Sequence, residues 1–195
     1  PGGGLTLTGA LAVDGGTVKL DGNYPTGTQN VALGDTALDS VQSGGNKNTA
    51  IGHAALTTVT TGDDNTGIGF GALELNTGAS NTAVGKSSLQ SNTTASNNTA
   101  VGTSSLNANT TGTNQVAFGY EALFANTTGN YNNAFGLQAL RCNTTASNNT
   151  ALGNSAMKLN TTGTCNTAVG NDALFSNTTG AQNTAVGYKA LGPNT

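Results

Sequence analysis

The chain has 195 residues, of which 8% are charged and 29 are glycine, and its formal net charge is −3. With 6 Lys and Arg against 9 Asp and Glu, no basic stripe is present to neutralise phosphates, which excludes the usual kind of nucleic-acid-binding surface. The low charge argues against an extended disordered chain, and the absence of any run of about 18 apolar residues predicts no membrane-spanning helix.

Residues 1–29 differ in pattern from the rest, and we expect them to form a β connector. Residues 5–13 (LTLTGALAV) and 17–20 (TVKL) show strand-like apolar alternation, and residues 21–27 (DGNYPTG) have turn chemistry. The first residue is Pro1 rather than Met, so we expect a processed chain or a fragment of a longer one.

Residues 30–195 consist of ten copies of a 17-residue repeat. The repeat is marked by a glycine that ends a triplet such as AVG. The spacing between successive glycines of this kind equals the repeat length in all but two cases. The first spacing is longer by one residue and the third is shorter by one residue. These corner glycines are Gly34, Gly52, Gly69, Gly85, Gly102, Gly119, Gly136, Gly153, Gly170 and Gly187.

Positions aligned on the corner glycine form columns, meaning residues that share one position in successive repeats. The residue before the glycine is always large and apolar (the apolar column), and the second before it is Ala in nine copies (the alanine column). Four residues after it is Leu in nine copies (the leucine column). Asn stands four residues before it in nine copies, and seven residues after it from Asn76 onward.

This periodicity predicts a mainly β, parallel solenoid in which each repeat is one coil stacked on its neighbours. We expect the apolar and leucine columns to face inward, with Val186 and Leu191 in the core of the last coil. Alanine fits where coils approach closely, glycine allows a corner, and stacked asparagines form hydrogen-bonded ladders. The segment around the leucine is predicted to be a second strand or a single helical turn.

Ten coils at about 4.8 Å per coil give a rod on the order of 50 Å long. One coil encloses little apolar surface, so its burial barely offsets the entropy of the chain. We therefore expect the rod to associate with itself about its long axis, as a homotrimer.

Residues 17–41 (TVKLDGNYPTGTQNVALGDTALDSV), followed by NTAIG and NTAVG units with NTTG turns, resemble the shaft repeats of tail-fibre proteins from marine tailed phages, cyanophages especially. The AVG-type rung is more loosely similar to the β-roll head of trimeric autotransporter adhesins, whose repeat is shorter. Both resemblances imply an elongated homotrimeric surface rod that carries or contacts a receptor-binding element.

The tail-fibre resemblance implies a virion structural protein that serves host attachment. Its partners would be its own copies, other fibre or baseplate proteins and a cell-surface glycan or protein receptor, and its place the virion surface. The alternative is a bacterial adhesin head at the cell surface. Repeated Thr columns also allow an ice-binding solenoid, although an Asn-Thr-Thr corner suits ice less than a Thr-x-Thr strand face.

Variable columns follow each corner glycine and each core leucine, and we expect them to face outward. Aromatic and charged residues concentrate there, either as solvated surface or subunit packing, or as a shallow receptor contact. The candidate contact residues are Tyr120, Glu121, Phe124, Tyr188 and Lys189.

No catalytic, cofactor or metal site is expected. Of the nine acidic residues only Asp63 and Asp64 are adjacent, and a chain with the single histidine His53 offers no Ser-His-Asp set. The spacing between Cys142 and Cys165 fits no zinc pattern, so we expect two free thiols, with a disulfide as the alternative.

Overall fold

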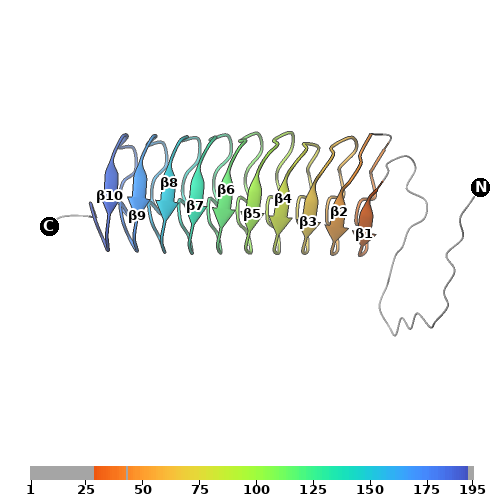
Figure 1. Ribbon diagram of the computed structural model, residues 1–195, viewed down its shortest axis with the longest axis horizontal. Coiled ribbons are helices and arrows are strands. Elements are labelled where there is room, and N and C mark those ends of the chain that lie inside the picture. Colours follow the sequence, from red (N-terminus) through yellow and green to blue (C-terminus); the bar gives the residue numbers. More distant parts are fainter. Residues whose placement is uncertain (1–28, 43, 193–195) are drawn as a thin grey trace, which may run out of the picture.

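The structure is a computed structural model, and it describes residues 29–42 and 44–192. These residues form a β-solenoid with one short strand in each coil, and no helix occurs among them. The ten strands stack in sequence order into one parallel sheet that runs along the rod (Figure 1). The predicted β connector lies outside the described residues, apart from Gln29.

Every strand has three residues and pairs in register with the equivalent residues of the next coil, as Ala83 does with Ala100. The longer first coil and the shorter third coil keep this register, because the extra and the missing residue fall in the turns. The strands are β1 (Val31–Leu33), β2 (Thr49–Ile51), β3 (Thr66–Ile68), β4 (Thr82–Val84), β5 (Thr99–Val101), β6 (Val116–Phe118), β7 (Asn133–Phe135), β8 (Thr150–Leu152), β9 (Thr167–Val169) and β10 (Thr184–Val186).

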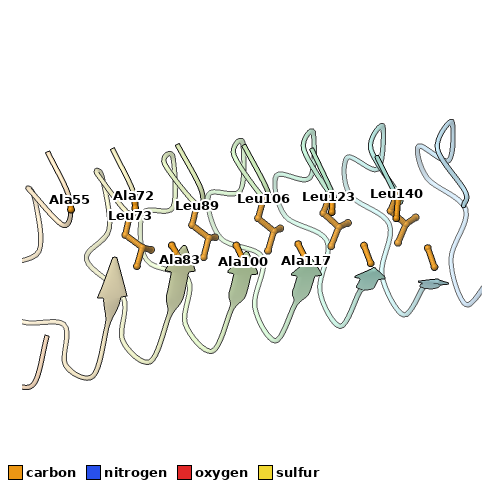
Figure 2. Packing of buried hydrophobic residues seen from close by; sticks show 14 of the residues in the cluster. Ala55, Ala72, Leu73, Ala83, Leu89, Ala100, Leu106, Ala117, Leu123 and Leu140 are labelled. Carbon is orange, nitrogen blue, oxygen red and sulfur yellow. The ribbon is translucent and has the colours of Figure 1, made fainter. Parts of the chain in front are cut away.

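The core of the rod is a row of leucines facing a row of alanines. Leu106 and Leu123 are fully buried, and they point toward the strand alanines Ala100 and Ala117 (Figure 2). The inward leucine column is thus confirmed for the inner coils. In the last coil the prediction is wrong, because no further described coil covers Leu191, which is 57% exposed.

The apolar column faces outward, contrary to our prediction. The small residue at the middle of each strand, Ala in nine strands and Gly67 in β3, is buried, while the large residue that follows it is at least partly exposed, up to 70% for Val186. The coil is narrow, and only a small side chain fits against the leucine. Because successive side chains of a strand point to opposite faces, burying the alanine puts both of its neighbours outside.

The segment around the leucine is neither a strand nor a helical turn. In the fifth coil Ser104 and Leu106 have φ values of 57° and 49°, in the left-handed region. The Ser104 amide donates to the Lys86 carbonyl of the preceding coil, and the Leu106 amide donates to the Ala122 carbonyl of the following one, each at 2.9 Å. Each left-handed residue costs about 1–2 kcal/mol of conformational free energy. In return, their backbone N–H groups point to both neighbouring coils.

The corner glycines are required both by conformation and by the close approach of the coils. Their φ values lie between 122° and 142°, where L side chains are strained. A Cβ added to Gly102 would also lie 2.5 Å from the carbonyl oxygen of Gly119 in the next coil. At Gly187, in the last described coil, an added Cβ would meet no atom within 4 Å.

Replacing Gly102 with alanine therefore adds a steric clash to backbone strain, whereas Gly187→Ala adds strain alone. Strain of this kind costs about 1–3 kcal/mol, and overpacking a further 1–3 kcal/mol or so. We expect Gly102→Ala to lower the free energy of unfolding by about 3 kcal/mol or more, and by clearly more than Gly187→Ala, in urea titrations followed by circular dichroism. Equal effects of the two variants would contradict the close packing of corners.

Two asparagine ladders run through the coils, as predicted. The turn ladder runs from Asn76 to Asn177, and from Asn92 onward each Nδ2 donates to the Oδ1 of the asparagine in the preceding coil at 2.6–3.1 Å. In the inner ladder each asparagine's Oδ1 accepts the backbone N–H of the next coil, for example Asn149 N–H to Asn132 Oδ1 at 3.1 Å. Among the described residues no buried side-chain N or O atom lacks a partner.

Removing one rung should destabilise the rod even where an apolar side chain fits. Asn143 makes three ladder bonds, to Asn126 Oδ1, to the Ala146 carbonyl and from Asn160 Nδ2, and valine is buried in this column at Val59. We expect Asn143→Val to lower the free energy of unfolding by about 2–4 kcal/mol, measured by urea titration. The exposed neighbour is the control, and Thr145→Val should change it by less than about 0.5 kcal/mol.

Candidate functional site

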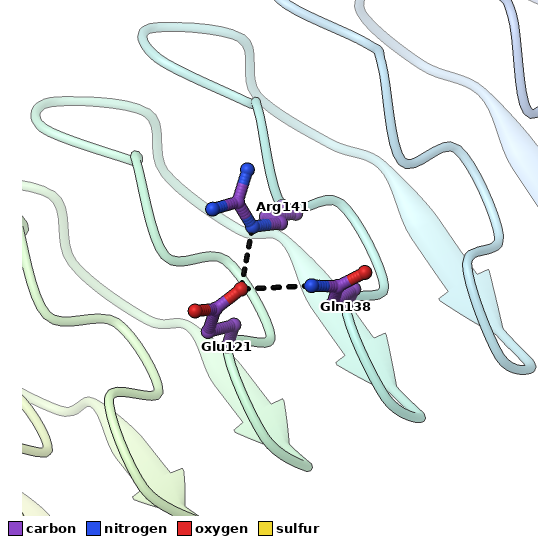
Figure 3. Close-up of polar contacts among 3 residues, drawn as sticks. All are labelled: Glu121, Gln138 and Arg141. Carbon is purple, nitrogen blue, oxygen red and sulfur yellow. Dashed lines mark hydrogen bonds and ion pairs between the residues drawn. The ribbon is translucent and has the colours of Figure 1, made fainter.

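The predicted contact residues of the sixth coil lie together where the chain turns away from β6. Tyr120 is 48% exposed, and the Glu121 side chain beside it is largely covered by two residues of the seventh coil. The Nε of Arg141 donates to Glu121 Oε2 at 2.6 Å, and the Nε2 of Gln138 donates to the same oxygen at 2.9 Å (Figure 3). Glu121 is therefore held between two coils.

Phe124 belongs to the same group through Arg141. The guanidinium carbon of Arg141 lies 5.4 Å from the centre of the Phe124 ring, a cation–π contact. The cation covers part of the ring, so Tyr120 offers the freer aromatic surface. We name Tyr120, Glu121, Phe124, Gln138 and Arg141 the corner cluster.

The charges of the corner cluster shift the proton affinities of its members. The pKa of the Glu121 carboxyl lies below its ordinary value of 4.5, chiefly because Arg141 donates a hydrogen bond to it. The pKa of Tyr120 is raised above 10.0, chiefly because its hydroxyl hydrogen-bonds to Glu121, whose negative charge opposes loss of the proton. Glu121 in turn raises the pKa of Arg141.

Tyr188 and Lys189 lie at the end of the rod and not in the corner cluster. They occupy the columns of Tyr120 and Glu121 four coils further on, since 188 − 120 is 4 × 17. Four coils span about 19 Å at the usual strand spacing. Tyr188 is 72% exposed, and Lys189 Nζ lies 5.1 Å from the centre of its ring. A hydrogen bond with Tyr188 raises the pKa of Lys189.

The structure adds Gln138 and Arg141 to the residues that the sequence proposed. The repeat carries a signal for both of them, because Gln138 follows Glu121, and Arg141 follows Phe124, by one full repeat. Side chains one repeat apart face each other along the rod, so opposite charges or cation and aromatic residues at that spacing predict contacts. Lys158 and Phe175 repeat the pattern, with Nζ 5.8 Å from the ring centre.

The other groups singled out in the sequence stay apart. Cys142 and Cys165 are both free thiols, as expected. His53 stacks on Phe70 with 5.2 Å between ring centres, and its Nε2 lies 3.8 Å from Asp35. In the described part of the chain no three His, Cys, Asp or Glu residues group closely enough to hold a metal ion. Nor does that part of the chain contain a helix with the length and apolarity that a membrane span requires.

No protein-family model, curated protein or solved structure matches this chain. The interpretation of the site therefore depends on its own chemistry, which combines a half-exposed tyrosine, a second aromatic ring and an ion pair. Such a surface offers an apolar ring face beside charged hydrogen-bonding groups, as the recognition of a sugar ring would require.

The Glu121–Arg141 pair predicts a stability difference that depends on pH. Because its folded-state pKa is lowered, ionised Glu121 stabilises the fold above its unfolded pKa, and this contribution is lost as the pH falls through the folded-state pKa. We expect Glu121→Gln to have a lower melting temperature than the unmodified chain at pH 7, and the same melting temperature once the pH is well below 4.5. In a chain that carries Arg141→Met, Glu121→Gln should no longer cause this pH-dependent difference in melting temperature. A difference between Glu121→Gln and the unmodified chain that persists in acid would contradict the ion pair.

Proposed function

We propose that the chain is a structural, non-enzymatic shaft segment of a phage tail fibre that serves attachment to a host cell. The observation that carries this proposal is that each coil contains two classes of position, one repeated and one variable. Core positions repeat through the ten coils and the turn-ladder asparagine repeats from Asn76 onward, whereas the residue directly after each corner glycine varies and is at least partly exposed. Such a stack supplies length and stiffness, and its variable outer columns supply most of the differences between coils.

In this role the rod would act as a homotrimer on the virion surface, joined to other fibre or baseplate proteins. The receptor would be a glycan or a protein of the host surface. The corner cluster, with Tyr188 and Lys189 as a second contact, is the surface that we propose for it. The chain's likeness to tail-fibre shaft repeats at residues 17–41 supports the phage assignment over an autotransporter-like adhesin head.

Ice binding is retained as a second candidate because of where the threonines lie. Seven of the ten strands begin with Thr, and these side chains point outward from the sheet beside the apolar column. A flat strand face of this kind suits ice better than the corner position that Asn-Thr-Thr suggested. Phe118, Asn133 and Phe135 interrupt the regular grid in the middle of the rod, and this favours the structural role.

Receptor contact can be tested on a glycan array with the unmodified chain and three variants. We expect Tyr120→Ala and Phe124→Ala each to weaken binding at least about tenfold, because the contribution of a buried aromatic contact exceeds about 1.4 kcal/mol. Tyr131→Ala is the matched control, since Tyr131 is 58% exposed but lies before β7, outside the corner cluster.

Binding that is unchanged in both variants would remove the corner cluster as the contact. The wider assignment has its own test in the flanking genes. Neighbouring tail genes would support the fibre, whereas a C-terminal membrane anchor in the full-length protein would favour the adhesin.

A further inference from the structure

The outward face of the sheet is uncharged along its whole length. We name it the strand face, and it consists of the first and third residue of each strand. None of these twenty residues is buried, and none is charged. The residues are Val31, Leu33, Thr49, Ile51, Thr66, Ile68, Thr82, Val84, Thr99, Val101, Val116, Phe118, Asn133, Phe135, Thr150, Leu152, Thr167, Val169, Thr184 and Val186.

The largest side chains of the strand face are adjacent. Phe118, Phe135 and Leu152 stand in three successive coils and are 53%, 39% and 49% exposed. The two rings stack on each other with 6.4 Å between their centres, which leaves their outer sides uncovered. Ten strands spaced about 4.8 Å apart, each about 10 Å long, give a face on the order of 450 Å². A patch of that size is comparable to the largest apolar patch of a typical monomer, and such patches are often functional.

The apolar column keeps its character although the core does not require it. In all ten coils it holds only Leu, Ile, Val or Phe, yet none of these side chains is buried. The exposed column after the corner glycine, by contrast, holds residues as different as His53, Lys86 and Asn154. Strand propensity alone is met by threonine as well as by valine or isoleucine. An outer column restricted to large apolar residues therefore indicates a contact outside the coil.

A partner for this face must be uncharged and must repeat at the spacing of the coils. A second copy of the chain meets both conditions, since its own strand face has the same spacing and every coil can meet an equivalent coil. We propose that the strand face is the surface through which copies of this chain associate along their long axes, with Phe118 and Phe135 at the centre of the contact. This inference rests on the proposed role as a shaft of several copies.

The test is sedimentation of the full chain, with association measured up to about 50 µM. We expect the unmodified chain to be oligomeric and Phe118→Asp with Phe135→Asp to associate at least tenfold more weakly, because two carboxylates would be desolvated in the contact. Both phenylalanines are outside the core, so the circular dichroism spectrum should be unchanged. Tyr131→Asp, at an exposed aromatic residue away from the strand face, should associate like the unmodified chain.

Crosslinking supplies an independent measurement. In a chain with Cys142→Ser and Cys165→Ser, Val101→Cys in β5 should form disulfides between copies under oxidation. In parallel copies each coil meets its equivalent, so the two introduced cysteines would lie side by side. Thr128→Cys, in an exposed turn, should form none.

Three results would overturn the inference. The first is a monomeric unmodified chain, and the second is a Phe118 and Phe135 variant that associates normally with Val101→Cys uncrosslinked. The third is a monomer whose thermal hysteresis is lost on mutation of the strand face, which would assign the face to ice. In the second case, an intact glycan contact would leave the proposed shaft standing and reject this face alone.

Discussion

The structure depends on hydrogen bonding along the rod axis. Both the strands and the turns pair with the next coil, as the backbone N–H groups of Thr99, Leu106 and Thr110 show by donating to the following coil at 2.8–2.9 Å. Because each coil must form backbone hydrogen bonds with the next one along its whole path, its backbone dihedral angles are restricted. Left-handed residues turn peptide groups along the axis, and glycine stands where two corners come within contact distance. The repeat in the sequence follows from this requirement.

The small core makes the ladders necessary. One leucine and two small residues per coil bury too little apolar area to offset the ordering of a whole coil, and the interior has no room for more. Hydrogen bonds of the buried asparagines supply further stabilisation. Each asparagine joins its own turn to the neighbouring coil, and none is left without a partner. Because the bonds of a ladder polarise one another, the coils are expected to stabilise each other cooperatively.

The period, the parallel stacking, the leucine column and both ladders could be predicted from the sequence, because each leaves the same residue at the same position of the repeat. The direction of the apolar column could not. Alternation in a strand allows either Ala100 or Val101 inside, and hydrophobicity favours Val101, whereas the narrow coil admits only Ala100. The choice is made by the space left beside Leu106, which belongs to another part of the coil.

The candidate site shows the same limit. Tyr120, Glu121 and Phe124 could be selected from variable columns, but Arg141 became part of the group only when coils were placed beside each other. Since the core imposes nothing on an outward column, variation there is the expected state. An outward column restricted to large apolar residues, such as the apolar column, is accounted for by the contact between copies that we propose. Two kinds of surface result, one uniform and suited to a partner with the same repeat, the other varied and suited to a ligand that distinguishes one coil from the next.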